Sequence, residues 1–229
     1  MNPVYCAVDT SDLWKAKKLV DAIKGEVGGL KLGLEFFMAH GAAGYQTIAG
    51  SGAPIFLDVK LHDIPNTVAG AVSSLVPLSP AYITIHASGG AAMMKAAVES
   101  AGKAQGARPK LLAVTVLTSL DSADLAAVGQ YANTTEQVVR LAKLAKESGV
   151  DGCICSPEEI KPLREALGKD FILMVPGIRP AWAASNDQKR TLTPREAYMA
   201  GASHLVIGRP ITKAEDPVEA ARKIAAELA

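Results

Sequence analysis

The sequence predicts a closed (β/α)8 barrel, the TIM barrel, in which parallel strands alternate with helices. Eight short β-type runs alternate with helical patterns from one end of the 229-residue chain to the other. Each helical segment supplies the crossover that two parallel strands require, and a count of eight favours a closed barrel over an open sheet. No shift in composition and no Pro/Ser-rich linker marks a boundary, so we expect one domain over residues 1–229.

The first half of the chain contains four of the predicted strands. They cover residues 4–8, 30–33, 55–61 and 82–86, and the run at 55–61 is the strongest strand signal in the sequence. Helical patterns separate these runs. Apolar residues recur at the spacing of one helix face over 13–23, a helical stretch passes through Phe36 and Phe37, and a segment rich in alanine and methionine follows Gly90.

The second half repeats this alternation, with predicted strands at 111–117, 153–155, 171–175 and 204–207. One helix ends near Gly149, and Pro157 lies just inside the start of the next, where its missing N–H costs nothing. A final amphipathic helix covers 218–228. Two longer loops, 119–134 and 180–194, follow strands, so we expect both at the carboxyl-terminal face, where such barrels carry their active sites.

The composition describes a near-neutral chain with ample apolar residues for a core. Lys and Arg number 24 against 23 Asp and Glu, and 49% of the residues are hydrophobic. This balance lacks the positive charge typical of general binding to nucleic acid or to an anionic membrane, so we expect neither partner. The three cysteines form no disulfide framework, and the sequence shows neither a signal-peptide pattern nor a long apolar run. We therefore expect a soluble cytoplasmic protein.

Ionisable residues lie at or near the carboxyl ends of the first four runs, where barrel strands are mostly apolar: Asp9, Lys31, Asp58, Lys60 and His86. Residues i and i+2 of a strand point to the same side, so Asp58 and Lys60 share a face, and Asp63 follows as the chain leaves the strand. A lysine flanked by two carboxylates can stabilise a developing negative charge and then donate a proton. A buried structural salt bridge is the alternative interpretation, although burying such charges is costly without a functional return.

Two glycine–arginine segments end the seventh and eighth predicted strands. Residues 176–179 read Pro-Gly-Ile-Arg, and residues 207–210 read Ile-Gly-Arg-Pro. Glycine lets backbone N–H groups approach an anion closely, and arginine can bind phosphate oxygens bidentately. Barrels often hold a phosphate with the loops after strands seven and eight. Each segment alone also fits an ordinary turn, but the two together predict a phosphorylated substrate.

The segment Asp58-x-Lys60-x-x-Asp63-Ile64-Pro65-x-Thr67 resembles the signature of the orotidine 5′-monophosphate decarboxylase family. A shorter Asp-x-Lys-x-x-Asp pattern would also fit related phosphosugar enzymes, so the extension to Ile-Pro-x-Thr carries the specificity. The resemblance covers the whole chain through further segments at 7–9, 30–33, 86–90, 117–119, 176–179, 186–188 and 206–209.

This resemblance implies a cofactor-free, metal-free decarboxylation of orotidine 5′-monophosphate to UMP in de novo pyrimidine biosynthesis. By position, Asp58 would lie against the departing C6 carboxylate, and Lys60 would stabilise the vinyl carbanion and protonate C6. Lys31 would link Asp58 to the ribose hydroxyls, and Asp9 would be another ribose contact.

The resemblance also implies roles for residues away from the reacting carbon. Asp63 and Thr67 match residues that reach across a two-fold interface into the neighbouring site, which implies an active homodimer. Thr118 and Ser119 match the segment that reads the pyrimidine edge. The expected phosphate contacts are Arg179, Gln188, Gly208 and Arg209. Closure of the loop that carries Gln188 would convert phosphate binding into transition-state stabilisation.

Three other interpretations remain open from the residues. A magnesium-dependent 3-keto-gulonate-phosphate decarboxylase or hexulose-phosphate synthase would use the carboxylates of the third strand to hold Mg²⁺, and its rate would fall in EDTA. A Schiff-base aldolase would use Lys60 as its nucleophile, although two neighbouring carboxylates would hold that lysine protonated. A catalytically inactive barrel would bind a phosphorylated ligand without turnover.

Overall fold

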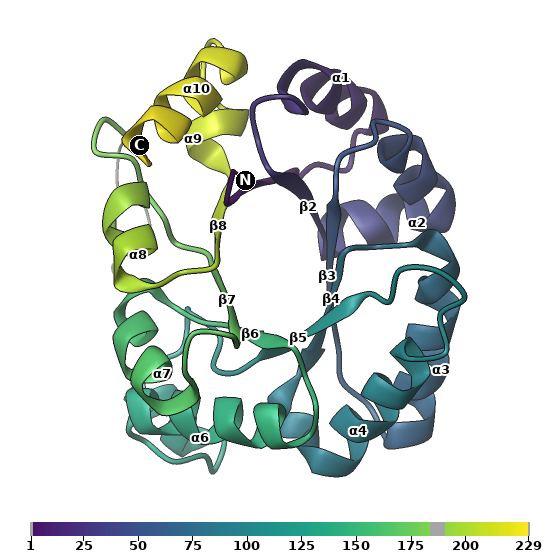
Figure 1. The fold of residues 1–229 in the computed structure, drawn as a ribbon, viewed down its shortest axis with the longest axis vertical. Helices are drawn as coiled ribbons and strands as arrows, with labels where there is room; N and C mark the ends of the chain where they lie inside the picture. Colours follow the sequence, from purple (N-terminus) through teal and green to yellow (C-terminus); the bar gives the residue numbers. More distant parts are fainter. Residues whose placement is uncertain (1, 184–190, 229) are drawn as a thin grey trace.

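Eight parallel strands close into a barrel in the computed structural model, which describes residues 2–183 and 191–228 (Figure 1). Each strand pairs with the next along the chain, and β8 pairs with β1. The strands are β1 (Val4–Ala7), β2 (Gly29–Gly33), β3 (Ile55–Leu61), β4 (Tyr82–His86), β5 (Lys110–Val114), β6 (Gly152–Ile154), β7 (Ile172–Val175) and β8 (His204–Ile207). The predicted (β/α)8 barrel is therefore confirmed.

Helices surround the barrel and connect consecutive strands (Figure 1). The α-helices are α1 (Leu13–Ile23), α2 (Leu34–Ala49), α3 (Pro65–Leu75), α4 (Gly90–Ala101), α5 (Ser122–Ala127), α6 (Thr134–Glu147), α7 (Ile160–Leu167), α8 (Pro194–Ala200), α9 (Arg209–Thr212) and α10 (Pro217–Glu227). In the described part of the chain, three short 3-10 segments complete the connections: η1 (Val76–Leu78), η2 (Ala87–Gly89) and η3 (Pro157–Glu159).

Strand side chains alternate between two cores, because successive residues of a strand point to opposite faces. The residues that point outward pack against the helices in a large buried cluster, to which Leu57 and Ile83 belong. Those that point inward form a second cluster inside the barrel, which contains Tyr5, Phe56, Tyr82, Leu112 and Met174. This inner cluster fills the amino-terminal side of the barrel, and two residues further along the same strands the inward positions include the polar residues Asp58 and Thr84.

The local sequence explains where several helices begin. The Asp12 side chain accepts a hydrogen bond from Lys15 N at the start of α1, over 3.0 Å. Pro65 and Pro157 occupy first turns, where proline forfeits no helical hydrogen bond. Thr193 opens α8 with a capping box, in which side chains and backbone N–H groups are satisfied reciprocally. These features mark the starts of α1, α3, η3 and α8.

The structure differs from the predicted elements after β5. The strand predicted over 111–117 ends at Val114, because its last partner in β6 is Ile154, where β6 also ends. Beyond this point, the Thr115 hydroxyl donates a hydrogen bond to the Ile154 carbonyl over 3.0 Å. The predicted loop over 119–134 contains α5, which begins with a capping box at Asp121. This six-residue helix is too short to show an apolar repeat in the sequence.

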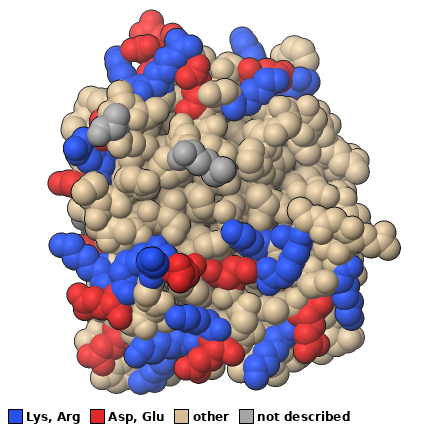
Figure 2. All heavy atoms as spheres, in the orientation of Figure 1, with Lys and Arg blue, Asp and Glu red and all other residues tan. Residues whose placement is uncertain are grey.

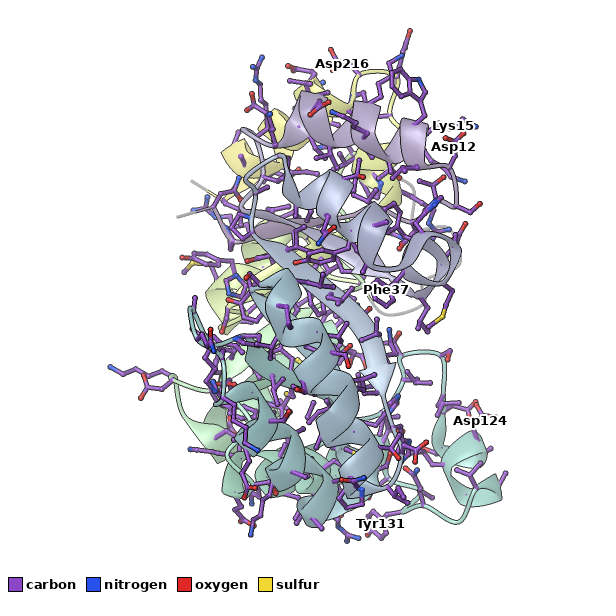
Figure 3. All side chains as sticks on the ribbon, turned by 90° about the vertical axis from the view of Figure 1, so that its right-hand side faces the viewer. Asp12, Lys15, Phe37, Asp124, Tyr131 and Asp216 are labelled. Atoms are coloured by element: carbon purple, nitrogen blue, oxygen red, sulfur yellow. The ribbon has the colours of Figure 1, made fainter. Side chains whose placement is uncertain are left out.

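The segments that follow the strands lie at one end of the barrel. Figure 3 shows Asp12, Phe37 and Asp124, which follow β1, β2 and β5, on the same side of the molecule. Because all the strands are parallel, their carboxyl ends meet at this end. The charged strand-end residues of the sequence are thereby gathered in one place.

The surface carries both signs of charge. On the face shown in Figure 2, acidic and basic side chains lie next to one another in the upper and lower parts, with a mainly uncharged region between them. Among the described residues, no helix is both long enough and apolar enough to span a membrane. An anionic ligand must accordingly be held by a local group of cations rather than by the field of the whole molecule.

Candidate active site

A cavity of about 300 Å³ opens at the carboxyl ends of the strands. Part of its wall is apolar and comes from Phe56, Val114, Val116, Ile154 and Val206. The cavity is also lined by eight of the residues that the sequence analysis proposed: Asp9, Lys31, Asp58, Lys60, Thr118, Arg179, Gly208 and Arg209. The barrel thus brings together polar residues from position 9 to position 209 around an apolar wall.

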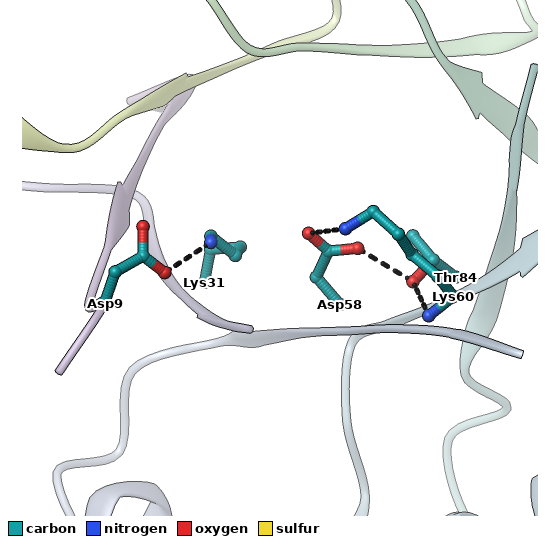
Figure 4. A network of polar contacts seen from close by, with 5 residues as sticks. All are labelled: Asp9, Lys31, Asp58, Lys60 and Thr84. Carbon is teal, nitrogen blue, oxygen red and sulfur yellow. Dashed lines mark hydrogen bonds and ion pairs between the residues drawn. The ribbon is translucent and has the colours of Figure 1, made fainter. Parts of the chain in front are cut away.

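Asp9 and Lys31 form one ion pair of the cavity (Figure 4). Lys31 Nζ donates to Asp9 Oδ1 over 2.6 Å. The pairing of β1 with β2 sets Ala7 beside Lys31, so Asp9 follows directly beyond the lysine. The Lys31 side chain is 12% exposed and that of Asp9 is 52% exposed. Asp9 can therefore accept a hydrogen bond from a ligand while it holds the more buried lysine in place.

Asp58 and Lys60 form a second ion pair (Figure 4). Lys60 Nζ donates to Asp58 Oδ2 over 2.8 Å, and the two side chains are 29% and 14% exposed, respectively. The other carboxylate oxygen, Asp58 Oδ1, accepts a hydrogen bond from Thr84 Oγ1 over 2.9 Å. The expected contact between Asp58 and Lys60 is therefore present, and both residues line the cavity.

The backbone at Lys60 is unusual. Its φ is +49°, a left-handed conformation that residues other than glycine rarely adopt. The pairing of β3 with β4 also changes register here, because Leu57 pairs with Ile83 but Leu61 pairs with Ile85. Such irregularities occur at sites where a side chain has to be re-aimed. Sequence spacing alone predicted that Asp58 and Lys60 share a face, but not this backbone.

Asp63 does not join the Asp58–Lys60 pair within one chain. Asp63 is exposed, and its Oδ1 accepts a hydrogen bond from Ile64 N over 2.7 Å. Residues 62–67 are all exposed, because the chain leaves β3 and starts α3 at Pro65. Among the described residues, the predicted cluster of one lysine between two acids is thus reduced to Asp58 and Lys60.

Lys31 is hydrogen-bonded to Asp9, whereas the resemblance implied that it links Asp58 to the ribose hydroxyls. Figure 4 shows Lys31 between Asp9 and Asp58, with its ammonium hydrogen-bonded to Asp9. The charged strand-end residues therefore form two separate pairs in this structure, not a continuous chain from Lys31 to Asp58.

Two histidines stack at the carboxyl ends of β3 and β4. The rings of His62 and His86 lie 5.2 Å apart between centroids, at an angle of 26°. Burial lowers the pKa of His86, and the nearby His62 and Lys60 lower it further. His86 is thus an uncharged neighbour of the site at neutral pH.

On the opposite wall, two arginines are among the described residues that line the cavity. Arg179 follows β7 and is buried, and its Nη1 donates to Ile178 O over 3.2 Å. Gly177 precedes it with a φ of +80°, which glycine adopts without strain. Arg209 follows β8, and Gly208 lies close enough to Ala7 that a Cβ there would be 3.4 Å from the Ala7 Cβ. Both predicted glycine–arginine segments therefore reach the same cavity.

Among the described residues, three of the proposed ones are not part of the cavity lining. Asp63, Thr67 and Ser119 are exposed and lie outside its lining. Gln188 lies outside the described residues.

Thr84 is a partner of the Asp58–Lys60 pair that the sequence analysis did not single out. It is fully buried in β4 and contacts both residues, since Lys60 N donates to its Oγ1 over 2.9 Å. The feature of the sequence that could have indicated Thr84 is its position in the predicted strand 82–86. Thr84 lies between Ile83 and Ile85 and shares the inward face of β4 with Tyr82 and His86.

A closed parallel barrel with paired charges and arginines around a cavity at its carboxyl ends defines a barrel enzyme that acts on an anionic substrate. Comparison with known proteins identifies the family. Residues 2–224 match the model of the Orotidine 5'-phosphate decarboxylase / HUMPS family. The chain belongs to this family.

Proteins named orotidine 5'-phosphate decarboxylase match this chain over its whole length. The orotidine 5'-phosphate decarboxylase of Paramagnetospirillum magneticum is 55% identical over 232 residues, which cover 100% of this chain and 99% of the relative. That of Novosphingobium aromaticivorans is 55% identical over 227 residues, covering 99% of both. The crystal structure of orotidine 5'-phosphate decarboxylase from Lactobacillus acidophilus is 39% identical, with a TM-score of 0.88 over 100% of this chain and 99% of that chain.

Proposed function

We propose that this protein decarboxylates orotidine 5′-monophosphate to UMP in pyrimidine biosynthesis, without a metal or cofactor. The observation that carries the proposal is the Asp58–Lys60 pair, with 2.8 Å between Lys60 Nζ and Asp58 Oδ2, at the cavity of a chain that belongs to this family. The alternative is the activity of a magnesium-dependent phosphosugar enzyme. Relatives at 55% identity are named orotidine 5'-phosphate decarboxylase, which favours decarboxylation of the nucleotide over this alternative.

In the proposed reaction, the bond between C6 of the pyrimidine and its carboxylate breaks, and CO₂ leaves. The electron pair stays on C6 as a vinyl carbanion. Lys60 stabilises this negative charge through its ammonium and then transfers a proton to C6, which leaves the lysine neutral until it takes up a proton from water. Asp58 lies against the departing carboxylate, and the repulsion between the two is relieved when CO₂ leaves.

The other proposed site residues would bind the nucleotide. Asp9 and Lys31 would contact the ribose hydroxyls, for which their charged, hydrogen-bonding groups at the cavity are suited. Thr118 lines the cavity on the side of β5 and would meet the pyrimidine edge with Ser119. The proposed phosphate contacts are Arg179, Gln188, Gly208 and Arg209, because two guanidinium groups can bind the phosphate oxygens.

We also propose that the active form is a homodimer, in which Asp63 and Thr67 complete the site of the partner. Both residues belong to the exposed stretch 62–67, beside the cavity-lining strand β3. Because the whole stretch is exposed, Asp63 and Thr67 are accessible to a second chain.

The proposed place of action is the cytoplasm. Cys6, Cys153 and Cys155 are free, buried thiols, which suit a reducing compartment.

The test follows the ultraviolet absorbance of orotidine 5′-monophosphate in EDTA for wild type and Lys60→Ala. We expect wild type to consume the substrate and the variant to lose about a thousandfold in kcat, because general-acid and charge stabilisation both disappear. Lys143→Ala, which removes an exposed lysine on α6, is the matched control and should retain full activity. A flat trace from folded wild type would refute the proposal, and activity on a phosphosugar that returns only with Mg²⁺ would establish the alternative.

A further inference from the structure

The change of register between β3 and β4 lies at the Asp58–Lys60 pair. Leu57 pairs with Ile83, and the next paired residues are Leu61 and Ile85. The chain therefore advances by four residues along β3 but by only two along β4. The strands are therefore not joined by their regular ladder where Lys60 takes its left-handed backbone conformation. Some other contact has to hold this backbone, because the conformation is intrinsically unfavourable for lysine.

Thr84 supplies that contact. It is the β4 residue between Ile83 and Ile85, and it is completely buried. Its Oγ1 accepts a hydrogen bond from Lys60 N over 2.9 Å and donates one to Asp58 Oδ1, also over 2.9 Å. A backbone N–H can only donate, so the single hydroxyl hydrogen of Thr84 is directed to the carboxylate.

These bonds close a ring around the pair. Starting at the backbone nitrogen of Lys60, the contacts pass through the Thr84 hydroxyl and the Asp58 carboxylate and return to the ammonium of the same lysine. Thr84 fixes the rotation of the carboxylate, because Oδ1 is bound to its hydroxyl and Oδ2 is left for Lys60 Nζ (Figure 4). The same hydroxyl holds the backbone from which the lysine side chain starts.

We propose that Thr84 is a positioning residue for the decarboxylation, which aims both the Asp58 carboxylate and the Lys60 ammonium through one buried hydroxyl. It acts through these two residues and does not line the cavity itself. This inference rests on the proposed function, because it assigns Thr84 a purpose only if Asp58 and Lys60 carry the reaction.

The first test compares Thr84→Val with Thr115→Val. Valine keeps the shape of threonine and lacks the hydroxyl. Thr115 is a matched control, since it is a buried threonine near the end of β5 whose hydroxyl bonds to the Ile154 carbonyl and not to the pair. We expect Thr84→Val to lower kcat by about 30- to 100-fold with KM changed by less than about threefold, because small displacements of reacting groups act on the chemical step. Thr115→Val should lower the melting temperature but leave kcat of the folded enzyme within about threefold.

The second test isolates the hydroxyl and remains informative if Thr84→Val does not fold. Thr84→Ser and Thr84→Ala differ only in the presence of that hydroxyl, and neither adds an atom to the buried site. We expect Thr84→Ser to exceed Thr84→Ala in kcat by at least about tenfold at similar KM. A smaller ratio, or equal effects of Thr84→Val and Thr115→Val on kcat, would show that Thr84 is only structural.

Wild type and Lys60→Ala are measured alongside these variants. If wild type does not decarboxylate the nucleotide, the proposed function itself fails. If wild type is active and Lys60→Ala is not, but the Thr84 variants keep the wild-type kcat, only the role of Thr84 is refuted.

Discussion

Each of the two lysines of the cavity is paired with an aspartate from another position in the chain. Lys31 is held by Asp9 over 2.6 Å, and Lys60 is held by Asp58 over 2.8 Å. Charge-assisted hydrogen bonds of this kind are short and directional, so they hold long lysine side chains in a single orientation. On the opposite wall, Arg179 and Arg209 bring two further positive charges to the cavity.

Arg209→Met tests the proposed binding of phosphate. Methionine keeps much of the length of the side chain and removes its charge and donors. We expect KM for orotidine 5′-monophosphate to rise about 10- to 100-fold, since a hydrogen bond to a charged group contributes about 1.5–3 kcal/mol. The change is measured by steady-state kinetics. Arg140→Met, on α6 away from the cavity, is the control, and an unchanged KM for Arg209→Met would contradict the assignment.

At the level of elements, close contact between β6 and β7 requires a glycine. Gly152 pairs with Ile172, and a Cβ at Gly152 would lie 2.3 Å from the Ile172 carbonyl oxygen. A carbonyl oxygen within a strand cannot turn aside as a flexible side chain could. The strands would therefore have to separate if any larger residue replaced this glycine.

Gly152→Ala should accordingly destabilise the barrel by about 2–3 kcal/mol, as overpacking of a core does. Urea unfolding followed by circular dichroism measures the loss. Gly25→Ala is the matched control, because no atom lies within 4 Å of the added Cβ, and we expect a change below about 0.5 kcal/mol. Equal stability of the two variants would mean that the strands can separate at no cost.

Across the whole barrel, aromatic residues close the amino-terminal side. Tyr82 OH and His204 Nε2 are 2.9 Å apart, which joins β4 to β8 through the interior. Tyr5 packs edge-on against both rings, with centroid distances of 5.7 and 5.2 Å. Burial, with a smaller effect from Lys110, lowers the pKa of His204 to about 4.

The low pKa of His204 predicts a loss of stability in mild acid. The unfolded chain takes up a proton at this histidine near its ordinary value of 6.5, whereas the folded protein does so only near 4. The unfolded state thus binds more protons between these values, and the free energy of unfolding falls as the pH falls from 6.5 to 4. We expect His204 to contribute about 2 kcal/mol to this fall, which allows for its partial access to solvent.

Urea unfolding at several pH values, for wild type and His204→Gln, measures this contribution. Glutamine can still bond to the Tyr82 hydroxyl but does not titrate. The variant should lose less stability than wild type between pH 6.5 and 4. Parallel curves for the two proteins would show that His204 makes no such contribution.

Assembly of the whole enzyme can be tested by mixing inactive variants. In the proposed dimer, a hybrid of Lys60→Ala and Asp63→Ala chains contains one complete site, formed by Lys60 of one chain and Asp63 of the other. Random exchange of equal amounts should restore about one quarter of the wild-type activity, because half of the dimers are hybrids with one working site each. Each variant alone should be nearly inactive, and mixtures without any gain would contradict a shared site.

The sequence by itself determined the order of strands and helices, because apolar spacing, glycine and proline act over a few residues. The strands at 55–61, 82–86 and 204–207 have the predicted bounds. It also located the charged strand ends, and the parallel alternation implied that they would meet. The short helix α5 and the early end of β5 were not predicted, since a six-residue helix has no apolar repeat and strand length depends on the neighbouring strand.

Only the tertiary structure decided how the site is arranged. The pairing of Lys31 with Asp9 joins residues 22 positions apart, and the bond from Thr84 to Asp58 spans 26 positions. The left-handed backbone of Lys60 likewise depends on the register between β3 and β4. Such contacts form when strands that are distant in sequence become neighbours in the barrel, and no local pattern of residues specifies them.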